Sequence, residues 1–262
     1  MAYKKGARVI SYTPGFIPFA VVYQIVMAAV RLFDWLVYRI RIRGRENLRG
    51  VHGAVLVSNH TLLFDPGIIA HALRPRRTYF TMLEETALIP FLGTFVRLLG
   101  GVPIPERPGA LRTLDTAARE AMTRLGFIHF FPEGECYRGN QDIMPFHWGA
   151  FLLAARLGVP IVPVTTVLHE RRWRGATSVR ILGRAVRLPP RVTVVIGAPR
   201  RAPPARPRKD AAQAAVPLKS AAAAWGSEVR AAMQAVIDGE GGTRVLSRGV
   251  MPRLVKRSPS AA

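Results

Sequence analysis

Cysteine and acidic residues are scarce in this sequence. Cys136 is the one cysteine among 262 residues, so the sequence excludes an intrachain disulfide and a cysteine-based zinc cluster. Asp and Glu number 16 against 38 Lys and Arg, which gives a formal net charge of +22. Such a charge favours an anionic partner, which can be nucleic acid, an anionic membrane or an acidic small molecule. Because 49% of the residues are hydrophobic, we favour a membrane and expect no nucleic-acid partner.

A long uninterrupted hydrophobic run is also lacking. No charged residue occurs in residues 9–30, but Pro14, Gly15, Pro18 and Gln24 interrupt this stretch. Its firmly apolar part is therefore shorter than the ~20 residues that a spanning helix needs. We expect one or two N-terminal helices that associate with a membrane by lying in its interface. A true span, a buried helix and a signal peptide are the alternatives.

Residues 39–45 alternate arginine with isoleucine, which places the arginines on one face of a strand. That face is either solvated or directed at anionic lipid headgroups, to which each basic residue contributes on the order of 1 kcal/mol. We expect the protein on the cytoplasmic face of a membrane. It would be peripheral or monotopic, or held by one N-terminal membrane helix.

Strand and helix patterns alternate through most of the chain, which predicts an α/β fold. We expect a single mixed, mostly parallel sheet flanked by helices and preceded by N-terminal apolar helices that associate with the membrane. Three parts follow: N-terminal membrane-associating helices at 1–38, an α/β domain at 39–238, and a basic, disordered tail at 239–262. The expected strands are 39–45, 51–57, 77–82, 101–105, 127–131, 159–167, 179–182 and 192–197. The expected helices are 65–73, 84–99 with a break near Pro90, 111–125, 149–157 and 218–236.

The first block that carries chemistry is SNHTLLFD at residues 58–65, directly after the strand expected at 51–57. Loops after strands hold the active sites of open α/β sheets. His60 has a side chain that can take a proton from a hydroxyl near neutral pH, and a carboxylate such as Asp65 can hold its ring in the required orientation. In the alternative reading, Asp65 only N-caps the helix that starts at Pro66, and His60 is a structural loop residue.

No nucleophile of the enzyme accompanies this block. The sequence has no G-x-S-x-G motif, and Cys136 lies in no recognisable Cys/His motif. We therefore expect His60 to activate a hydroxyl of the substrate.

The second block is FPEG at residues 131–134. The N-H-x4-D and F-P-E-G blocks, in this order, resemble the glycerolipid acyltransferase family, which is typified by 1-acylglycerol-3-phosphate acyltransferase. Smaller resemblances occur at residues 44–48, 101–107, 146–150 and 159–164, so the likeness covers about residues 40 to 170.

The resemblance implies a membrane-associated O-acyltransferase of phospholipid biosynthesis. It would move a fatty acyl group from acyl-CoA or acyl-carrier protein to the hydroxyl of a lysolipid, with 1-acylglycerol-3-phosphate as the expected acceptor. No metal and no bound cofactor are expected, because the acyl thioester is a co-substrate. The resemblance makes His60 the catalytic base and Asp65 its orienting partner. It also implies five substrate-binding residues: Asn59, Arg107, Glu133, Gly134 and Arg138.

The sequence departs from the family pattern beside the second block. The family often continues with Thr-Arg-Ser, whereas this chain has Glu135 and Cys136, and it is acidic at Glu84 and Glu85, where many members carry a lysine. The lower positive charge leaves other acceptors open, namely a lyso-ornithine lipid, a glycolipid or another lysophospholipid. A thioesterase, in which His60 activates water, and a basic membrane- or nucleic-acid-binding protein without chemistry are the remaining alternatives.

Overall fold

The computed structural model describes residues 17–87, 89–104, 110–172, 174–181, 184–202 and 218–243. The substrate-binding role expected for Arg107 and most of the expected tail therefore fall outside the described residues.

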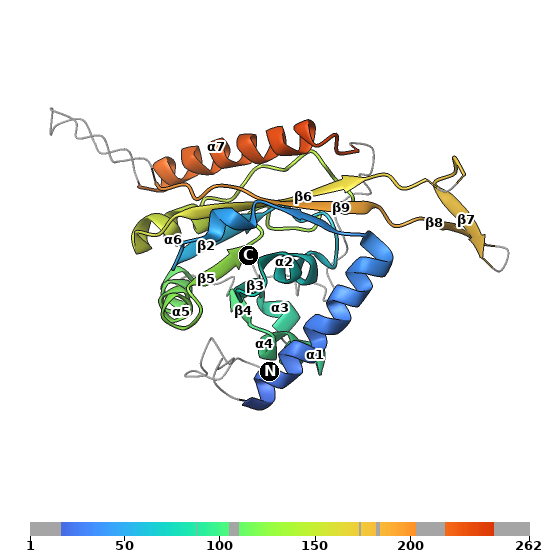
Figure 1. Cartoon of the computed structure of the whole chain (residues 1–262). Coiled ribbons are helices and arrows are strands. Elements are labelled where there is room, and N and C mark those ends of the chain that lie inside the picture. Colours follow the sequence, from blue (N-terminus) through green and yellow to red (C-terminus); the bar gives the residue numbers. More distant parts are fainter. Residues whose placement is uncertain are drawn as a thin grey trace, which may run out of the picture.

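A seven-stranded sheet forms the centre of the described chain (Figure 1), with the strand order β1-β9-β6-β2-β5-β3-β4. Neighbouring strands pair in parallel except for β6 and β9, which are antiparallel. The expected α/β class and the mixed, mostly parallel sheet are confirmed. The strands are β1 (Arg41–Arg43), β2 (Ala54–Ser58), β3 (Tyr79–Leu83), β4 (Gly101–Ile104), β5 (Phe127–Phe130), β6 (Ile161–His169) and β9 (Arg191–Ile196).

The central strand β2 is buried on both faces, and its side chains divide between two hydrophobic cores. Val55 and Val57 belong to one core, whereas Ala54 and Leu56 belong to the other, as the twofold periodicity of a strand requires. Helices cover both faces of a mostly parallel sheet in this way because its strands are apolar on both sides. The first core packs against α5 (Ala110–Arg124), α6 (Gly149–Leu157) and α7 (Leu218–Gly239), and the second against η2 (Arg45–Leu48) and α2 (Asp65–Leu73).

Several predicted boundaries agree with the structure for the expected reasons. Helix α5 ends before Gly126, whose φ of +76° suits a glycine, and a Cβ there would lie 2.1 Å from the carbonyl oxygen of His52. The helix expected at 84–99 is divided near Pro90 into α3 (Glu84–Ala87) and α4 (Leu92–Leu98).

One expected strand does not join the main sheet. The segment expected at 179–182 forms β7 (Ser178–Ile181), which pairs antiparallel with β8 (Arg184–Arg187), a strand that we did not predict. The pair projects from the end of the sheet (Figure 1). All four residues of β8 are exposed, so no alternating apolar face marks it in the sequence.

The N-terminal region is one helix within the described residues. Helix α1 (Ile17–Phe33) continues into the π-helical turn η1 (Asp34–Tyr38) and contacts α2 through Tyr23, Met27 and Ala70. The 18 residues Val21–Tyr38 are long and apolar enough to cross a membrane, a test that core helices and signal sequences also pass, and 17% of them are buried. The helix runs along the side of the molecule (Figure 1) and exposes large apolar side chains: Val21, Val22, Ile25, Leu32, Phe33, Trp35 and Leu36.

Candidate active site

The two sequence blocks meet at one edge of the sheet. Strands β2 and β5 are parallel neighbours, with Val57 opposite Phe130, so the residues that follow them lie side by side. The backbone N–H of His60 donates a hydrogen bond to Oε1 of Glu133 at 2.8 Å. The sheet topology thus brings together two residues that are 73 positions apart in the sequence.

His60 and Asp65 form the expected pair. The Nδ1 atom of His60 lies 2.9 Å from Oδ2 of Asp65, and the same oxygen accepts hydrogen bonds from the backbone N–H groups of Thr61 at 2.7 Å and Leu62 at 2.8 Å. Three donors therefore fix the buried carboxylate toward the loop that carries His60.

The N-cap assignment for Asp65 was wrong. Helix α2 begins at Asp65, and Phe64 occupies the N-cap position without a side-chain capping bond. The carboxylate of Asp65 instead accepts from the preceding loop, because that loop turns back over the first turn of the helix.

The ring of His60 has a fixed orientation but remains partly accessible. It stacks on Phe131, with ring centroids 4.0 Å apart and an interplanar angle of 20°, and 18% of its side chain is exposed. A ring held on one face and at Nδ1 can present its remaining nitrogen to a substrate.

Cys136 is a contact of His60 that the sequence did not reveal, and its side chain hydrogen-bonds to the ring. Burial by itself lowers the pKa of His60, but the hydrogen bonds with Asp65 and Cys136 raise the pKa of His60 to about 10. The ring therefore holds a proton at neutral pH in the free protein, and the neutral base is the minor form.

Glu133 joins two backbone segments around His60. Its Oε1 accepts from the N–H of His60, and its Oε2 accepts from the N–H of Met144 at 3.0 Å. Burial raises the pKa of Glu133 to about 7, although the two backbone hydrogen bonds act in the opposite direction. Since both oxygens bind backbone donors, the geometry assigns Glu133 to holding the loop of His60 in place. The next residue, Gly134, is exposed and has a φ of +77°. A Cβ atom added at Gly134 would lie 3.0 Å from the ring of His147.

Both polar atoms of the Asn59 side chain bond to the backbone of β6. Its amide nitrogen donates to the carbonyl oxygen of Thr166 at 2.9 Å, and its amide oxygen accepts from the N–H of Thr166 at 2.8 Å. Its side chain is buried in these contacts, so Asn59 connects the end of β2 to β6. The substrate-binding role expected for Asn59 stays a prediction, and the contacts of its side chain in the structure are with the backbone of Thr166.

Arg138 lies in the loop that packs against the loop of His60. The backbone N–H of Tyr137 donates to the carbonyl oxygen of His60 at 2.9 Å, and that of Gly139 donates to Thr61 at 2.7 Å. The exposed side chain of Arg138 lines a cavity beyond these hydrogen bonds. Within the described residues, no group of three or more His, Cys, Asp or Glu side chains could hold a metal ion.

A second histidine–aspartate pair lies outside this site. The Nδ1 atom of His71, on α2, is 2.7 Å from Oδ2 of Asp34, on η1. The two residues are 37 positions apart, and no short motif in the sequence joins them.

Comparisons with known proteins agree with this arrangement. Residues 39–167 match a family model described as Acyltransferase. The chain is similar to the 1-acyl-sn-glycerol-3-phosphate acyltransferase of Haemophilus influenzae, with 29% identity over 55% of this chain and 62% of that protein. It is also similar to the enzyme of that name from Saccharomyces cerevisiae, with 30% identity over 55% of this chain and 50% of that protein. The matched part of the chain thus spans between 50% and 62% of the length of these two relatives.

The fold is similar to that of a solved structure. The 1-acyl-sn-glycerophosphate (LPA) acyltransferase PlsC from Thermotoga maritima has a TM-score of 0.55 to this chain. The match covers 86% of this chain and 83% of that chain at 20% sequence identity, so it supports the fold.

Proposed function

We propose that this chain, whose residues 39–167 match the acyltransferase family model, transfers a fatty acyl group from an acyl thioester to the hydroxyl of a lysolipid. The observation that carries the proposal is the His60 ring, whose Nδ1 atom is held by a buried carboxylate while part of the ring is exposed. A substrate hydroxyl is the group that such a base activates when the enzyme supplies no serine.

In the proposed reaction, neutral His60 removes the proton from the acceptor hydroxyl, and the oxygen attacks the carbonyl carbon of the thioester. The tetrahedral intermediate collapses as the C–S bond breaks. The leaving thiolate then takes the proton from the His60 imidazolium, so the products are an ester and a free thiol. Asp65 stabilises the imidazolium and holds the ring, and the protein mainly contributes alignment because a thioester is already activated.

The first candidate acceptor is 1-acylglycerol-3-phosphate, which is the substrate in the names of the two relatives. Glu135 and Cys136 stand where the family pattern is often Thr and Arg, which keeps a lyso-ornithine lipid, a glycolipid or a less anionic lysophospholipid as alternative acceptors. The donor is acyl-CoA or acyl-carrier protein.

The exposed apolar surface supports a membrane-associated enzyme. The rings of Phe33, on α1, and Phe64, in the loop of His60, are in edge contact with centroids 4.9 Å apart. Leu63, in the same loop, is 64% exposed. The apolar face of α1 and η1 therefore continues to the candidate active site, and we place both at the cytoplasmic surface of a membrane, where a lysolipid resides.

The direct test is an acceptor panel with the whole protein in detergent micelles. Labelled acyl-CoA and acyl-carrier protein are each offered with 1-acylglycerol-3-phosphate, lyso-ornithine lipid, a lysoglycolipid and lysophosphatidylcholine, and the labelled product is separated. We expect acceptor-dependent transfer with wild-type protein and none above background with His60→Ala. Absence of transfer to every acceptor, or equal transfer by both proteins, contradicts the proposal.

A thioesterase is the second candidate. The thiol of Cys136 contacts the ring of His60, and the same ring is bonded to the carboxylate of Asp65. In that reaction Cys136 or water, rather than a lipid hydroxyl, attacks the thioester. Thiol release that no acceptor in the panel stimulates favours this candidate over acyl transfer.

A further inference from the structure

The hairpin of β7 and β8 lies outside the part of the chain that matches the acyltransferase family model. It falls between β6 and β9, whereas the matched segment ends at residue 167. Within the described chain its two strands pair with each other and project from the end of the seven-stranded sheet (Figure 1). Every residue of β8 is exposed. Because a two-stranded hairpin without a core is only marginally stable in water, a partner that covers this element would stabilise it.

The hairpin carries positive charge and no negative charge. Residues 171–191 are rich in arginine and contain no Asp or Glu. The antiparallel register places Arg180 and Arg187 on one face of the hairpin and Arg184 on the other. All three side chains belong to exposed residues. Positive charge is therefore presented on both faces, which suits an anionic partner of large extent.

One carboxylate compensates part of this charge. Glu170, which directly precedes the segment, lies 3.6 Å from a guanidinium nitrogen of Arg187 and 3.0 Å from one of Arg172. Among the ion pairs of the described residues, none involves Arg180 or Arg184. These two guanidinium groups therefore keep their full charge for a partner.

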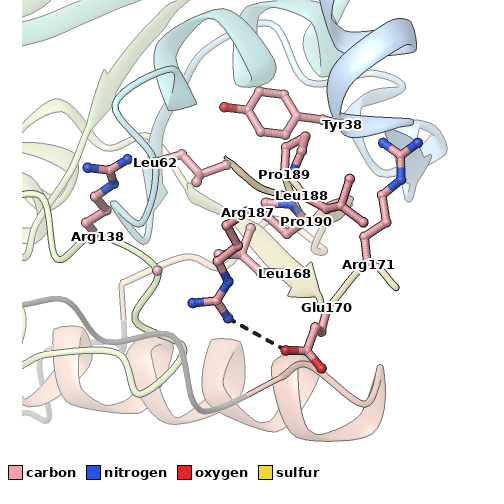
Figure 2. Close-up of a pocket in the computed structure, with 11 residues that line it drawn as sticks. Tyr38, Leu62, Arg138, Leu168, Glu170, Arg171, Arg187, Leu188, Pro189 and Pro190 are labelled. Atoms are coloured by element: carbon pink, nitrogen blue, oxygen red, sulfur yellow. Dashed lines mark ion pairs between the residues drawn. The ribbon is translucent and has the colours of Figure 1, made fainter. Parts of the chain in front are cut away.

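The base of the hairpin adjoins the apolar end of the N-terminal helix. A guanidinium nitrogen of Arg171 donates to the carbonyl oxygen of Val37, in η1, at 3.4 Å. Tyr38, at the end of η1, and Leu188, after β8, line the same cavity (Figure 2). Trp35, also in η1, is 69% exposed. Indole rings of membrane proteins gather at the level of the lipid headgroups, so a membrane bound by η1 has its headgroups at the level of the hairpin.

We propose that the β7–β8 hairpin binds the anionic headgroups of the membrane on which α1 and η1 lie. The guanidinium groups of Arg180 and Arg184 attract the lipid phosphates, while the exposed apolar side chains of η1 enter the interface. The enzyme then has two kinds of membrane contact. The apolar contact is indifferent to lipid charge, and the basic contact selects anionic lipid. The proposal rests on the proposed membrane location of the enzyme but not on acyl transfer.

An acidic protein, such as an acyl-carrier protein that delivers the donor, is the alternative partner for the same charge. It would match the arginines but leave the apolar side chains of Trp35 and Leu36 exposed to water, and Leu36 is 56% exposed. A bilayer covers both surfaces at once, which favours the membrane as the partner.

The test variant is Arg180→Gln/Arg184→Gln, and Arg119→Gln/Arg156→Gln is the matched control. The control loses the same two positive charges from α5 and α6, which lie at the other end of the sheet (Figure 1). The side chains of Arg119 and Arg156 are 59% and 46% exposed. A third variant, Arg180→Lys/Arg184→Lys, keeps the charge of the hairpin. Melting temperatures of all variants are compared with wild type first.

Each full-length protein is offered two kinds of vesicle at the same time. One kind consists of phosphatidylcholine and the other of phosphatidylcholine and phosphatidylglycerol in equal parts. The two kinds differ in density, so flotation separates them and the protein bound to each is measured. Competition between them isolates the effect of lipid charge, because α1 and η1 contribute equally to both.

We expect wild type to prefer the anionic vesicles, and added salt to weaken this preference. The test variant should lose about 25-fold in preference, at about fivefold per arginine, while the control stays within about twofold of wild type. The lysine variant should keep the preference, since attraction to lipid phosphates follows the charge of the side chain.

The proposal is overturned if wild type distributes equally between the vesicles, or if the control loses as much preference as the test variant. Calorimetric titration with acyl-carrier protein covers the alternative partner. If the test variant loses affinity for that protein but keeps its preference for anionic vesicles, the hairpin binds an acidic protein instead. None of these measurements needs acyl transfer, so failure of the proposed reaction and failure of the hairpin proposal are distinguishable.

Discussion

The part of the chain that the structure describes contains two histidine–aspartate pairs of nearly the same geometry. The distance between Nδ1 and Oδ2 is 2.9 Å for His60 and Asp65 and 2.7 Å for His71 and Asp34. In both pairs the histidine side chain is 18% exposed and the aspartate side chain is 0% exposed. The geometry of the pair alone therefore does not distinguish a catalytic site from a structural contact.

The surroundings of the two pairs are different. His60 and Asp65 lie in one loop at the end of β2, next to Cys136 and the loop that follows β5. His71 and Asp34 instead connect α2 to the end of the N-terminal helix. The first pair lies between two loops at the edge of the sheet, whereas the second holds one helical element against another. We therefore expect their variants to separate catalysis from docking of the N-terminal helix.

Replacing the two histidines should give the largest contrast. We expect His60→Ala to lower the rate of acyl transfer in micelles by about 10³-fold, because the base is lost. His71→Ala should retain the rate within about threefold but lose on the order of 3 kcal/mol of stability, since it leaves a buried aspartate without its partner. Initial rates and thermal unfolding of both variants check this. Equal losses of rate would remove the distinction between the pairs.

The corresponding aspartate variants should differ in the same direction. Asp65→Asn should lower the rate by about 10²- to 10⁴-fold, because an amide cannot stabilise the His60 imidazolium and favours the wrong ring tautomer. Asp34→Asn should leave the rate in micelles near that of wild type. Measuring kcat and KM separately is informative, because the loss in Asp65→Asn should occur in kcat. Similar kcat values for the two variants contradict this assignment.

Glu133→Gln tests the two hydrogen bonds by which Glu133 holds the loop of His60. The amide can accept one of the two backbone hydrogen bonds but turns an N–H group toward the other donor, so it should weaken the loop by about 1–3 kcal/mol. We expect a rate about tenfold lower and a lower melting temperature. A variant that is stable like wild type but has a higher KM for the acceptor would instead restore the substrate-binding role predicted from the sequence.

The smallest expected effect is a shift in pH dependence. Because the pKa of His60 is raised to about 10, kcat/KM should rise with pH over the neutral and mildly alkaline range as the ring loses its proton. Cys136→Ala removes one of the hydrogen bonds that raise this pKa, so the profile should move to lower pH and the rate at pH 7 should increase. Cys136→Ser, which keeps a hydrogen-bonding group, and His71→Ala are the controls. A shift to higher pH in Cys136→Ala is the contrary result.

The sequence was sufficient for features with a local cause. Helix α5 follows from apolar residues at spacings of three and four, and the division between α3 and α4 follows from Pro90. The position of His60 after a buried strand likewise follows from residues 51–60. In each case the pattern and its structural consequence lie within one short segment.

The sequence was insufficient where a contact depends on strand register. The hydrogen bonds of Asn59 with Thr166 require β2 and β6 to be neighbours, and those of Glu133 require β2 and β5 to be neighbours. A motif places such residues near an active site but does not say whether they face the substrate or the backbone. The pair of His71 and Asp34 was missed for the same reason, because it depends on how α1 and η1 pack on α2.

The central claim is that the substrate supplies the nucleophile, and Cys136 is the group in contact with His60 that could replace it. The most direct measurement is the intact mass of the protein after incubation with acyl-CoA and no acceptor. Direct transfer predicts unmodified protein and no rapid release of CoA. A stoichiometric acyl adduct on Cys136 that forms with wild type, requires His60 and transfers to added lysolipid would contradict the account.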